Sequence, residues 1–393
     1  MVIMTRAELA INGGEPAIRG PLRTYNSIGE LEIEYANDAM KRGPLSGYLG
    51  GNPNGGYWCE RLEAIMADKF NVNHAIAVNS ATSGILAALY AAGCGKGSLV
   101  ATSPYTMSGT IAPAAVLNAR IGFYDIEPKT FNLDLSCLEG DYPEFLIVPN
   151  IFGHPAELSK IRKYCDGYDI IMIEDNAQSP FAMEYGKYAG TIGHIGVFSL
   201  NVHKHIQCGE GGIVVTNDDT FADKVRGFRN HGELSGGFAG LNLRMTEVTA
   251  AIACAQIERS YELIASRIAY AERLNEIVQP YEEFIIPPFV REGCKHVYYT
   301  LAAKIPRGRD WFCSALRAEG MPISSGYSKI FELPAFLRDS GDFPITNLVD
   351  SQLVMVEICA HDPSEDQFKQ IQEAFDKVCE DAVKTASRRQ KNA

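Results

Sequence analysis

A lysine between two apolar segments constrains the possible folds of this chain more than any other feature. Residues 195–198 and 213–216 are short and apolar, as expected for two buried strands, and Lys204 lies between them. A glycine-rich turn, Gly209-Glu210-Gly211-Gly212, follows the lysine and lets the backbone approach a ligand closely. A lysine enclosed by buried strands is costly to leave unpaired. Either its amine reaches solvent from a plain hairpin, or it is a desolvated nucleophile that forms a Schiff base.

A second segment favours the Schiff base. Residues 170–173 are apolar and predict a buried strand, which ends in the acid pair Glu174-Asp175. Pyridoxal phosphate needs a lysine for its aldehyde and a carboxylate for its pyridine nitrogen. Asp175 at the end of one strand, followed by Lys204 after another, supplies both groups.

The predicted strands alternate with predicted helices from residue 75 to residue 216. This alternation predicts a mainly parallel sheet with helices on both faces, which binds ligands at the carboxyl ends of its strands. Residues 79–84, Asn-Ser-Ala-Thr-Ser-Gly, stand between a strand and a helix. Their backbone N–H groups and the helix dipole suit a phosphate group, although Ser80 or Thr82 also suits a plain helix N-cap.

Together these motifs resemble those of the DegT/StrS family of sugar aminotransferases, which are fold-type I pyridoxal-phosphate enzymes. The matching residues are Ser199, Lys204 and Gly209 to Gly212, with Glu174 to Gln178 upstream. The resemblance covers residues 30 to 267 and fades in the last third of the chain. It implies an α/β three-layer sandwich like that of aspartate aminotransferase, followed by a smaller C-terminal α+β domain. We place the large domain at residues 1–259 and the small domain at residues 260–393. The sequence also predicts a glycine-rich loop at residues 43–57, one long helix from residue 246 to about residue 278, and a strand at residues 297–301.

The resemblance also implies a role for each site residue. Lys204 carries the cofactor and moves protons, and Asp175 pairs with the pyridinium nitrogen. Gln178 contacts the ring oxygen and Ala177 packs beneath the ring. The phosphate contacts fall on Ser80, Ala81, Thr82, Ser83 and Ser199, together with Asn242 of the partner subunit.

Two positions depart from the family pattern. The family places Trp or Phe after the threonine at position 106, where the side chain stacks on the pyridine ring, and this chain has Met107. A thioether also packs on an aromatic face, and Tyr105 is the alternative stacking residue. Where many members have Tyr-x-x-x-His, this chain has Tyr327 followed by Phe331, so the substrate-facing end differs.

The resemblance predicts an aminotransferase that uses pyridoxal 5′-phosphate. Its amino donor would be glutamate or glutamine, and its acceptor a nucleotide-linked keto-sugar or a keto-cyclitol. The same scaffold allows a sugar dehydratase or a non-catalytic sugar-binding or regulatory protein. The dehydratase branch has histidine in place of the lysine, so Lys204 argues against it. Lys204, Asp175 and Ser199 together argue against a non-catalytic protein. The family pattern also implies a homodimer with shared active sites.

Composition excludes several other classes. The net charge of −12 over 393 residues argues against a nucleic-acid surface. No apolar run is long enough to span a membrane, and the first ten residues lack the apolar core of a signal peptide. The ten cysteines form no C-x-x-C pair, which is typical of buried thiols in a reducing compartment and not of a zinc site. We therefore expect a cytoplasmic protein without a metal site.

Overall fold

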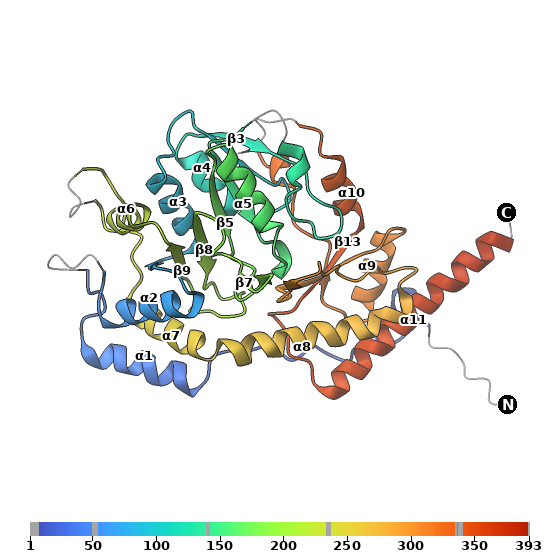
Figure 1. Cartoon of the computed structure of the whole chain (residues 1–393). Coiled ribbons are helices and arrows are strands. Elements are labelled where there is room, and N and C mark those ends of the chain that lie inside the picture. The colour runs from blue at the N-terminus through green and yellow to red at the C-terminus, as the bar shows by residue number, and fades with distance from the viewer. Residues whose placement is uncertain are drawn as a thin grey trace.

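The computed structural model describes residues 8–48, 54–138, 142–232, 237–334, 336 and 341–391, with side chains described as far as residue 384. Within these ranges the chain forms a larger unit around a seven-stranded sheet and a smaller C-terminal unit around a three-stranded sheet (Figure 1). Part of the glycine-rich loop predicted at residues 43–57, namely residues 49–53, lies outside the described residues.

The large sheet has the strand order β1-β9-β8-β5-β4-β2-β3. Its strands are β1 (His74–Val78), β2 (Leu99–Thr102), β3 (Arg120–Phe123), β4 (Phe145–Pro149), β5 (Ile171–Asp175), β8 (Ile195–Ser199) and β9 (Gly212–Thr216). Strand β9 is antiparallel to both of its neighbours, and every other pair in the sheet is parallel. The predicted α/β fold with a mainly parallel sheet is therefore confirmed.

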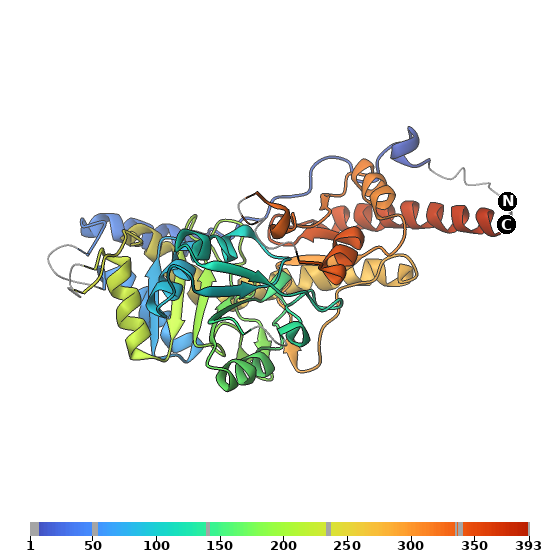
Figure 2. The same ribbon diagram turned by 90° about the horizontal axis from the view of Figure 1, so that it is seen from above.

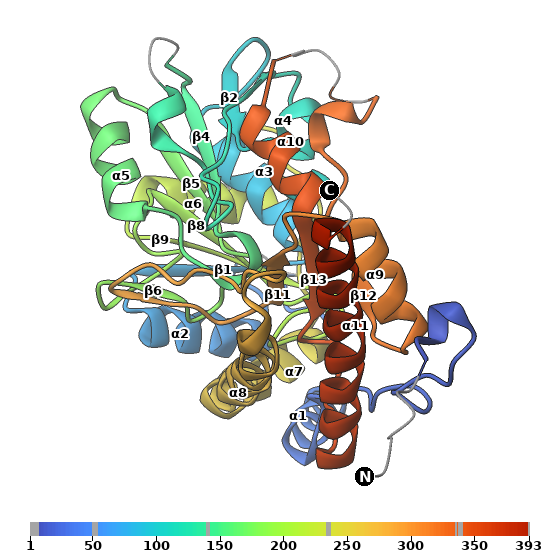
Figure 3. The same cartoon turned by 90° about the vertical axis from the view of Figure 1, so that its right-hand side faces the viewer.

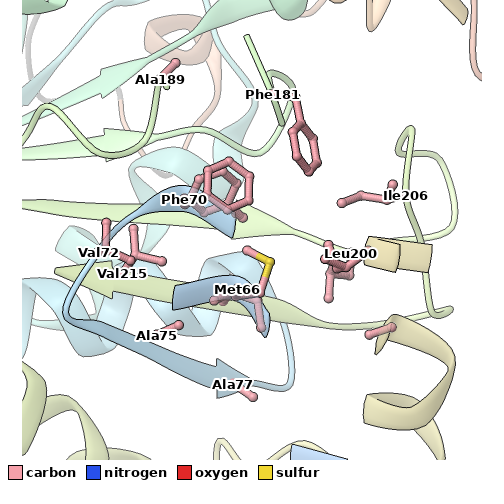
Figure 4. Packing of buried hydrophobic residues seen from close by; sticks show 14 of the residues in the cluster. Met66, Phe70, Val72, Ala75, Ala77, Phe181, Ala189, Leu200, Ile206 and Val215 are labelled. Carbon is pink, nitrogen blue, oxygen red and sulfur yellow. The ribbon is translucent and has the colours of Figure 1, made fainter. Parts of the chain in front are cut away.

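Helices cover both faces of this sheet (Figure 2). Apolar side chains of α2 (Tyr57–Phe70), α5 (Leu158–Gly167) and α7 (Glu247–Glu258) share one buried cluster, and those of α3 (Ala81–Ala91), α4 (Ala112–Val116) and α6 (Asp219–Arg229) share another. Successive residues of β9 alternate between the clusters, since Ile213 and Val215 belong to the first and Val214 to the second. Figure 4 shows Met66 and Phe70 of α2 packed near Val215. The three-layer arrangement follows from this alternation.

The segment predicted as one helix from residue 246 to residue 278 is two helices. Helix α7 ends at Glu258, and α8 (Ser260–Val278) begins beyond Arg259, whose ψ of 2° leaves helical geometry. The Arg259 guanidinium bonds the buried carboxylate of Glu32 in α1 (Glu30–Arg42) at 2.8 Å. The prediction of a single helix was wrong because the helical spacing of apolar residues continues through Arg259, where the backbone leaves helical geometry. The ion pair with Glu32 is made by the residue at this break.

The smaller unit contains an antiparallel sheet of order β11-β13-β12. Its elements are β11 (Thr300–Lys304), α9 (Arg309–Ala318), β12 (Ile323–Ser324), α10 (Pro344–Gln352), β13 (Leu353–Glu357) and α11 (Glu365–Lys391). A further small sheet has the order β10-β6-β7, with β6 (Met183–Glu184), β7 (Lys187–Tyr188) and β10 (Cys294–Lys295). Helix α11 runs beside α9 (Figure 3) and projects beyond the rest of the molecule (Figure 1).

The N-terminal lead-in packs into the core of this smaller unit. Leu9, Ile18 and Leu22 lie in the same buried cluster as side chains of α9 and α11. The buried carboxylate of Glu319 accepts hydrogen bonds from the backbone N–H groups of Ala10, at 2.8 Å, and Ala17, at 2.9 Å. The boundary predicted at residue 259 remains a prediction. Residues 9–22 contact the C-terminal unit, whereas Ser27 accepts hydrogen bonds from Gln207 and Gln256 of the larger unit.

All ten cysteines are free thiols. Among the described residues, no helix combines the length and apolarity needed to cross a bilayer.

Candidate active site

A cavity of about 610 Å³ lies at the edge of the large sheet where the parallel strands end and β9 begins. Nine of the predicted site residues line it: Ser80, Ala81, Thr82, Met107, Asp175, Ala177, Gln178, Ser199 and Lys204. The two others, Ser83 and Asn242, are described but do not line it. The sheet topology thus gathers residues from five separate loops at one place, as expected for an open α/β sheet.

Lys204 lies in the turn that joins β8 to β9 and is only 9% exposed. Its backbone N–H donates to the carbonyl of Asn201 at 2.9 Å, and its Nζ lies 4.2 Å from the centre of the Tyr299 ring. Burial lowers the pKa of Lys204 to about 8, although the nearby carboxylate of Asp175 opposes this shift. An amine with such a pKa is partly unprotonated near neutral pH and can act as a nucleophile.

Asp175 ends strand β5 and faces the same cavity. Its Oδ2 accepts a hydrogen bond from Thr110 Oγ1 at 2.7 Å, and its Oδ1 accepts one from the N–H of Ala177 at 3.1 Å. Burial raises the pKa of Asp175, and both hydrogen bonds act against that rise. A buried carboxylate of this kind is stabilised by a cation placed opposite it, which a protonated pyridine nitrogen would supply.

The other member of the acid pair, Glu174, has a structural role. It is fully buried, and its carboxylate accepts hydrogen bonds from the backbone N–H groups of Gly190 at 2.6 Å and Ile192 at 2.7 Å. It also accepts one from Gly193 at 2.5 Å. Because side chains alternate along a strand, Glu174 anchors this loop while Asp175 points into the cavity.

The segment from Ser80 to Thr82 forms the opposite wall of the cavity. Ser80 is the N-cap of α3, and its Oγ accepts from the N–H of Ser83 at 3.1 Å, which explains why Ser83 does not line the cavity. A Cβ added to Gly212 would stand 2.5 Å from the carbonyl carbon of Ser80 and 2.6 Å from the nitrogen of Ala81. Only glycine therefore lets β9 start against this turn, whose helix N-terminus suits a phosphate group.

The two candidate stacking residues lie in different places. Met107 lines the cavity and is 56% exposed, whereas Tyr105 is fully buried and does not line it. The Tyr105 hydroxyl accepts from the N–H of Tyr327 at 3.3 Å. Gln178 is held at both ends of its amide, because Nε2 donates to the Tyr327 hydroxyl at 3.3 Å and Oε1 accepts from the N–H of Phe152 at 2.7 Å.

Several residues that line the cavity received no role from the sequence, among them Thr110 and Tyr299, and Tyr327 was noted there only as a departure from the family pattern. Residues 297–301 were predicted as one strand, but β11 begins at Thr300 because Tyr298 adopts a left-handed φ of 52°. Tyr299 therefore turns out of the sheet and toward Lys204. Two adjacent tyrosines next to a strand give no sequence signal of this turn. Thr110 follows Thr106 by four residues, and its hydroxyl could have been recognised from the sequence as a hydrogen-bond donor.

The histidines near the lysine differ in their surroundings. His203 is exposed and lines the cavity, whereas His205 is fully buried with Nε2 2.8 Å from the carbonyl oxygen of Val297. His154 is also buried, and its Nε2 accepts from the N–H of Arg291 at 3.0 Å. His154 and His205 therefore hold the fold together. Within the described ranges, no group of three metal-binding side chains occurs.

Comparison with known proteins decides the family. The model of the DegT/DnrJ/EryC1/StrS aminotransferase family matches residues 28–376. The chain belongs to this family. It is therefore a pyridoxal-phosphate-dependent aminotransferase, and its cofactor is pyridoxal 5′-phosphate.

The names of two relatives of this chain denote different kinds of substrate. GDP-perosamine synthase of Caulobacter vibrioides is 28% identical over 78% of this chain and 84% of the relative. A protein of Streptoalloteichus tenebrarius, provisionally named L-glutamine:3-amino-2,3-dideoxy-scyllo-inosose aminotransferase, is 30% identical over 85% of this chain and 82% of the relative. The first name denotes a nucleotide-linked sugar and the second a cyclitol.

Solved structures confirm the fold. The structure of DesI in the presence of its TDP-sugar product superposes with a TM-score of 0.86 and 23% identity, covering 97% of this chain and 99% of that one. A GDP-4-keto-6-deoxymannose-3-dehydratase superposes with a TM-score of 0.80 and 21% identity, covering 91% of this chain and all of that one. At these identities the likeness establishes the fold and does not distinguish the two chemistries.

The residues that line the cavity fit the cofactor. When bound, pyridoxal phosphate supplies an aldehyde for an amine and a ring that withdraws electrons. Lys204 has the depressed pKa that covalent attachment would need, and Asp175 would supply the anion for the ring nitrogen. The start of α3 offers N–H groups to the phosphate.

Proposed function

We propose that the chain transfers an amino group from glutamate or glutamine to a ketone. The ketone belongs either to a nucleotide-linked keto-sugar or to a keto-cyclitol. The observation that carries this proposal is the placement of Lys204 and Asp175 in one cavity, with the amine of depressed pKa facing the carboxylate. In this proposal Lys204 moves the proton between the two carbons that exchange the amino group, because a lysine of pKa about 8 both accepts and donates near neutral pH. Met107 covers the face of the ring.

The two half-reactions test this proposal separately. Glutamate and glutamine are added in turn to the purified holoenzyme, and the cofactor absorbance is followed from its aldehyde form to its amine form. Keto-sugars and keto-cyclitols are then added singly, and an acceptor should restore the first spectrum. Absence of any spectral change with both donors would contradict the proposed donor class.

Covalent attachment tests the site itself. Borohydride reduction followed by peptide mapping should place a pyridoxyl group on Lys204, because its amine is the one described lysine amine that lines the cavity. A label on any other lysine would contradict the assignment of the site.

Two alternative functions use the same fold. A dehydratase of this family resembles the chain but has histidine at the lysine position, and Lys204 opposes that function. His205 is next to Lys204 in sequence, but its ring is buried against the carbonyl of Val297 and does not line the cavity. A non-catalytic protein would have no need of the buried Lys204 and Asp175. Release of water from a 4-keto-sugar without uptake of an amino group would support the dehydratase instead.

We further propose a homodimer in which Asn242 of the partner subunit reaches the cofactor phosphate. Two observations support this: Asn242 does not line the cavity of its own chain, and Met107, Val202 and Leu241 are large apolar side chains that are about half exposed. Exposed large apolar side chains are typical of a subunit interface.

Mixed dimers of two inactive variants test the shared site. Lys204→Ala removes the nucleophile, and Asn242→Asp places a carboxylate against the phosphate. In a mixed two-fold dimer one site collects both changes and the other has neither, so about a quarter of all sites should recover. Each variant alone is the control. Activity that stays at the level of these controls, after labelling has confirmed subunit exchange, would refute the shared site.

The free thiols support our proposal that the chain acts in the cytoplasm, where thiols stay reduced.

A further inference from the structure

A second cavity adjoins the first. It has a volume of about 180 Å³ and is lined by His203, Tyr299, Thr300, Tyr327, Met355, Glu357, Cys359 and Ala360. His203, Tyr299 and Tyr327 line both cavities, so these three side chains form the boundary between them. The ring of Tyr299 that forms part of this boundary lies 4.2 Å from Lys204 Nζ. The second cavity therefore begins one aromatic ring away from the reacting nitrogen.

Its size admits a ring substituent of a substrate. Because a water molecule occupies about 30 Å³ of the liquid, the cavity has room for several non-hydrogen atoms. It lies between the lysine turn of the large unit and strands β11 and β13 of the small unit, where Glu357 pairs with Thr300 across the two strands. A substrate whose ketone carbon reaches Lys204 can extend into it.

Glu357 supplies the carboxylate that lines this cavity. Glu357 is the last residue of β13 and is exposed, and among the described residues no lysine, arginine or histidine forms an ion pair with it. Burial raises the pKa of Cys359 to about 12, so the neighbouring thiol is uncharged at neutral pH. Thr300 already donates its hydroxyl to the carbonyl of Val356 at 2.8 Å. Of these three side chains, Glu357 is thus the one whose carboxylate remains available to accept hydrogen bonds from a ligand.

We propose that this second cavity is a substrate-selecting subsite in which Glu357 accepts a hydrogen bond from a hydroxyl or ammonium group on the acceptor ring. A carboxylate repels anions, so the diphosphate of a nucleotide-linked substrate and the carboxylates of an amino-acid donor bind elsewhere. The inference rests on the proposed function, because it concerns the acceptor of the amino group.

Binding of unreactive cyclitols tests the subsite without turnover. The probes are myo-inositol, which carries only hydroxyl groups, scyllo-inosamine, which carries one ammonium group, and quinate, which carries a carboxylate. Their dissociation constants are measured by calorimetry on the holoenzyme and on the variants Glu357→Gln and Glu357→Lys. Glu373→Gln, which changes an exposed carboxylate on α11, is the matched control.

The variants have distinct expected effects. Glu357→Gln keeps an acceptor but loses the charge, so binding of scyllo-inosamine should weaken about five- to tenfold and that of myo-inositol by about threefold or less. Glu357→Lys should weaken scyllo-inosamine further and strengthen quinate. Glu373→Gln should match the wild type. Equal dissociation constants in the wild type and both Glu357 variants would overturn the proposal, and so would the absence of binding by both uncharged and cationic probes.

The donor half-reaction separates this proposal from the proposed function. The absorbance change with glutamate or glutamine should persist in Glu357→Gln, because the donor does not use the second cavity. If the wild-type protein shows no absorbance change with either donor, the proposed function is refuted. If the donor half-reaction is intact but probe binding is unchanged in the Glu357 variants, only the subsite is refuted.

Discussion

Thr110 is hydrogen-bonded to Asp175, the carboxylate that we propose as the partner of the cofactor's ring nitrogen. Its hydroxyl donates to Asp175 Oδ2 at 2.7 Å inside the protein, and Thr106 Oγ1 lies 3.0 Å from Thr110 Oγ1. Thr110→Val removes this donor and keeps the branched shape of the side chain. Because burial already raises the pKa of Asp175, loss of the hydroxyl should raise it further and weaken the hold of Asp175 on the protonated ring nitrogen.

The magnitude follows from the bond that is lost. A hydrogen bond to a charged group contributes about 1.5 to 3 kcal/mol, and the Asp175 carboxylate is buried, so little of this is screened. Loss of the bond should therefore raise the pKa of Asp175 further, because the bond stabilises the charged form. The same free energy corresponds to a rate of transamination lower by about ten- to a hundredfold.

Two measurements check this expectation. The ¹⁵N chemical shift of the ring nitrogen, in protein reconstituted with labelled cofactor, reports whether that nitrogen is protonated, and the donor half-reaction gives the rate. Thr110→Ser keeps the hydroxyl and should retain most of both properties. A folded Thr110→Val variant with a wild-type ¹⁵N shift and a wild-type rate would refute the reasoning.

Three further predictions concern the carboxylate, the buried histidines and the glycine beneath the phosphate turn. Asp175→Asn should lower transamination by at least roughly a hundredfold, the scale of losing one key electrostatic group, and near-normal turnover would show that another acid serves the ring. Burial lowers the pKa of both His154 and His205 to about 4 in the folded protein. As the pH falls below about 6.5, these histidines become protonated in the unfolded chain but not in the folded one, so the free energy of unfolding decreases until about pH 4. The free energy of unfolding in urea should therefore be smaller at pH 5 than at pH 7 by about 2 kcal/mol per histidine, and His205→Gln should reduce the difference; an equal pH dependence in that variant would contradict the assignment. Gly212→Ala should weaken cofactor binding at least about tenfold by displacing Ser80, whereas Gly95→Ala, where a Cβ meets nothing within 4 Å, should bind the cofactor normally; equal affinities in the two variants would show that the turn adapts.

The sequence predicted the parts of the site that backbone periodicity and strand ends determine. Asp175 and Lys204 were predicted because Asp175 ends one apolar strand and Lys204 lies in the turn after another, and the edge of a parallel sheet brings such positions together. Ser80 to Thr82 were found because a strand, small polar residues and a helix stand in series.

The residues that the sequence did not reveal depend on long-range packing. Tyr299 faces Lys204 because of the left-handed backbone at Tyr298, a conformation that tyrosine seldom adopts and that no local pattern signals. Tyr327 reaches Gln178 across 149 positions of the chain. Ser83 was predicted to contact the phosphate because it directly follows Ser80 to Thr82 in the sequence. In the structure its N–H donates to the Oγ of Ser80, the N-cap of α3. The break at Arg259 was missed because helical spacing of apolar residues continues through it.

The packing of the lead-in into the C-terminal core has a consequence for synthesis on the ribosome. Ala17 donates to Glu319 across 302 positions of the chain, so residues 9–22 have no binding site until the ribosome has added those positions. At about 5 to 20 residues per second, this takes about 15 to 60 seconds. During that interval the large sheet can fold from residues 74 to 216 alone, while Leu9, Ile18 and Leu22 are exposed to chaperones. Residues 9–22 are thus made long before the segments that bury them.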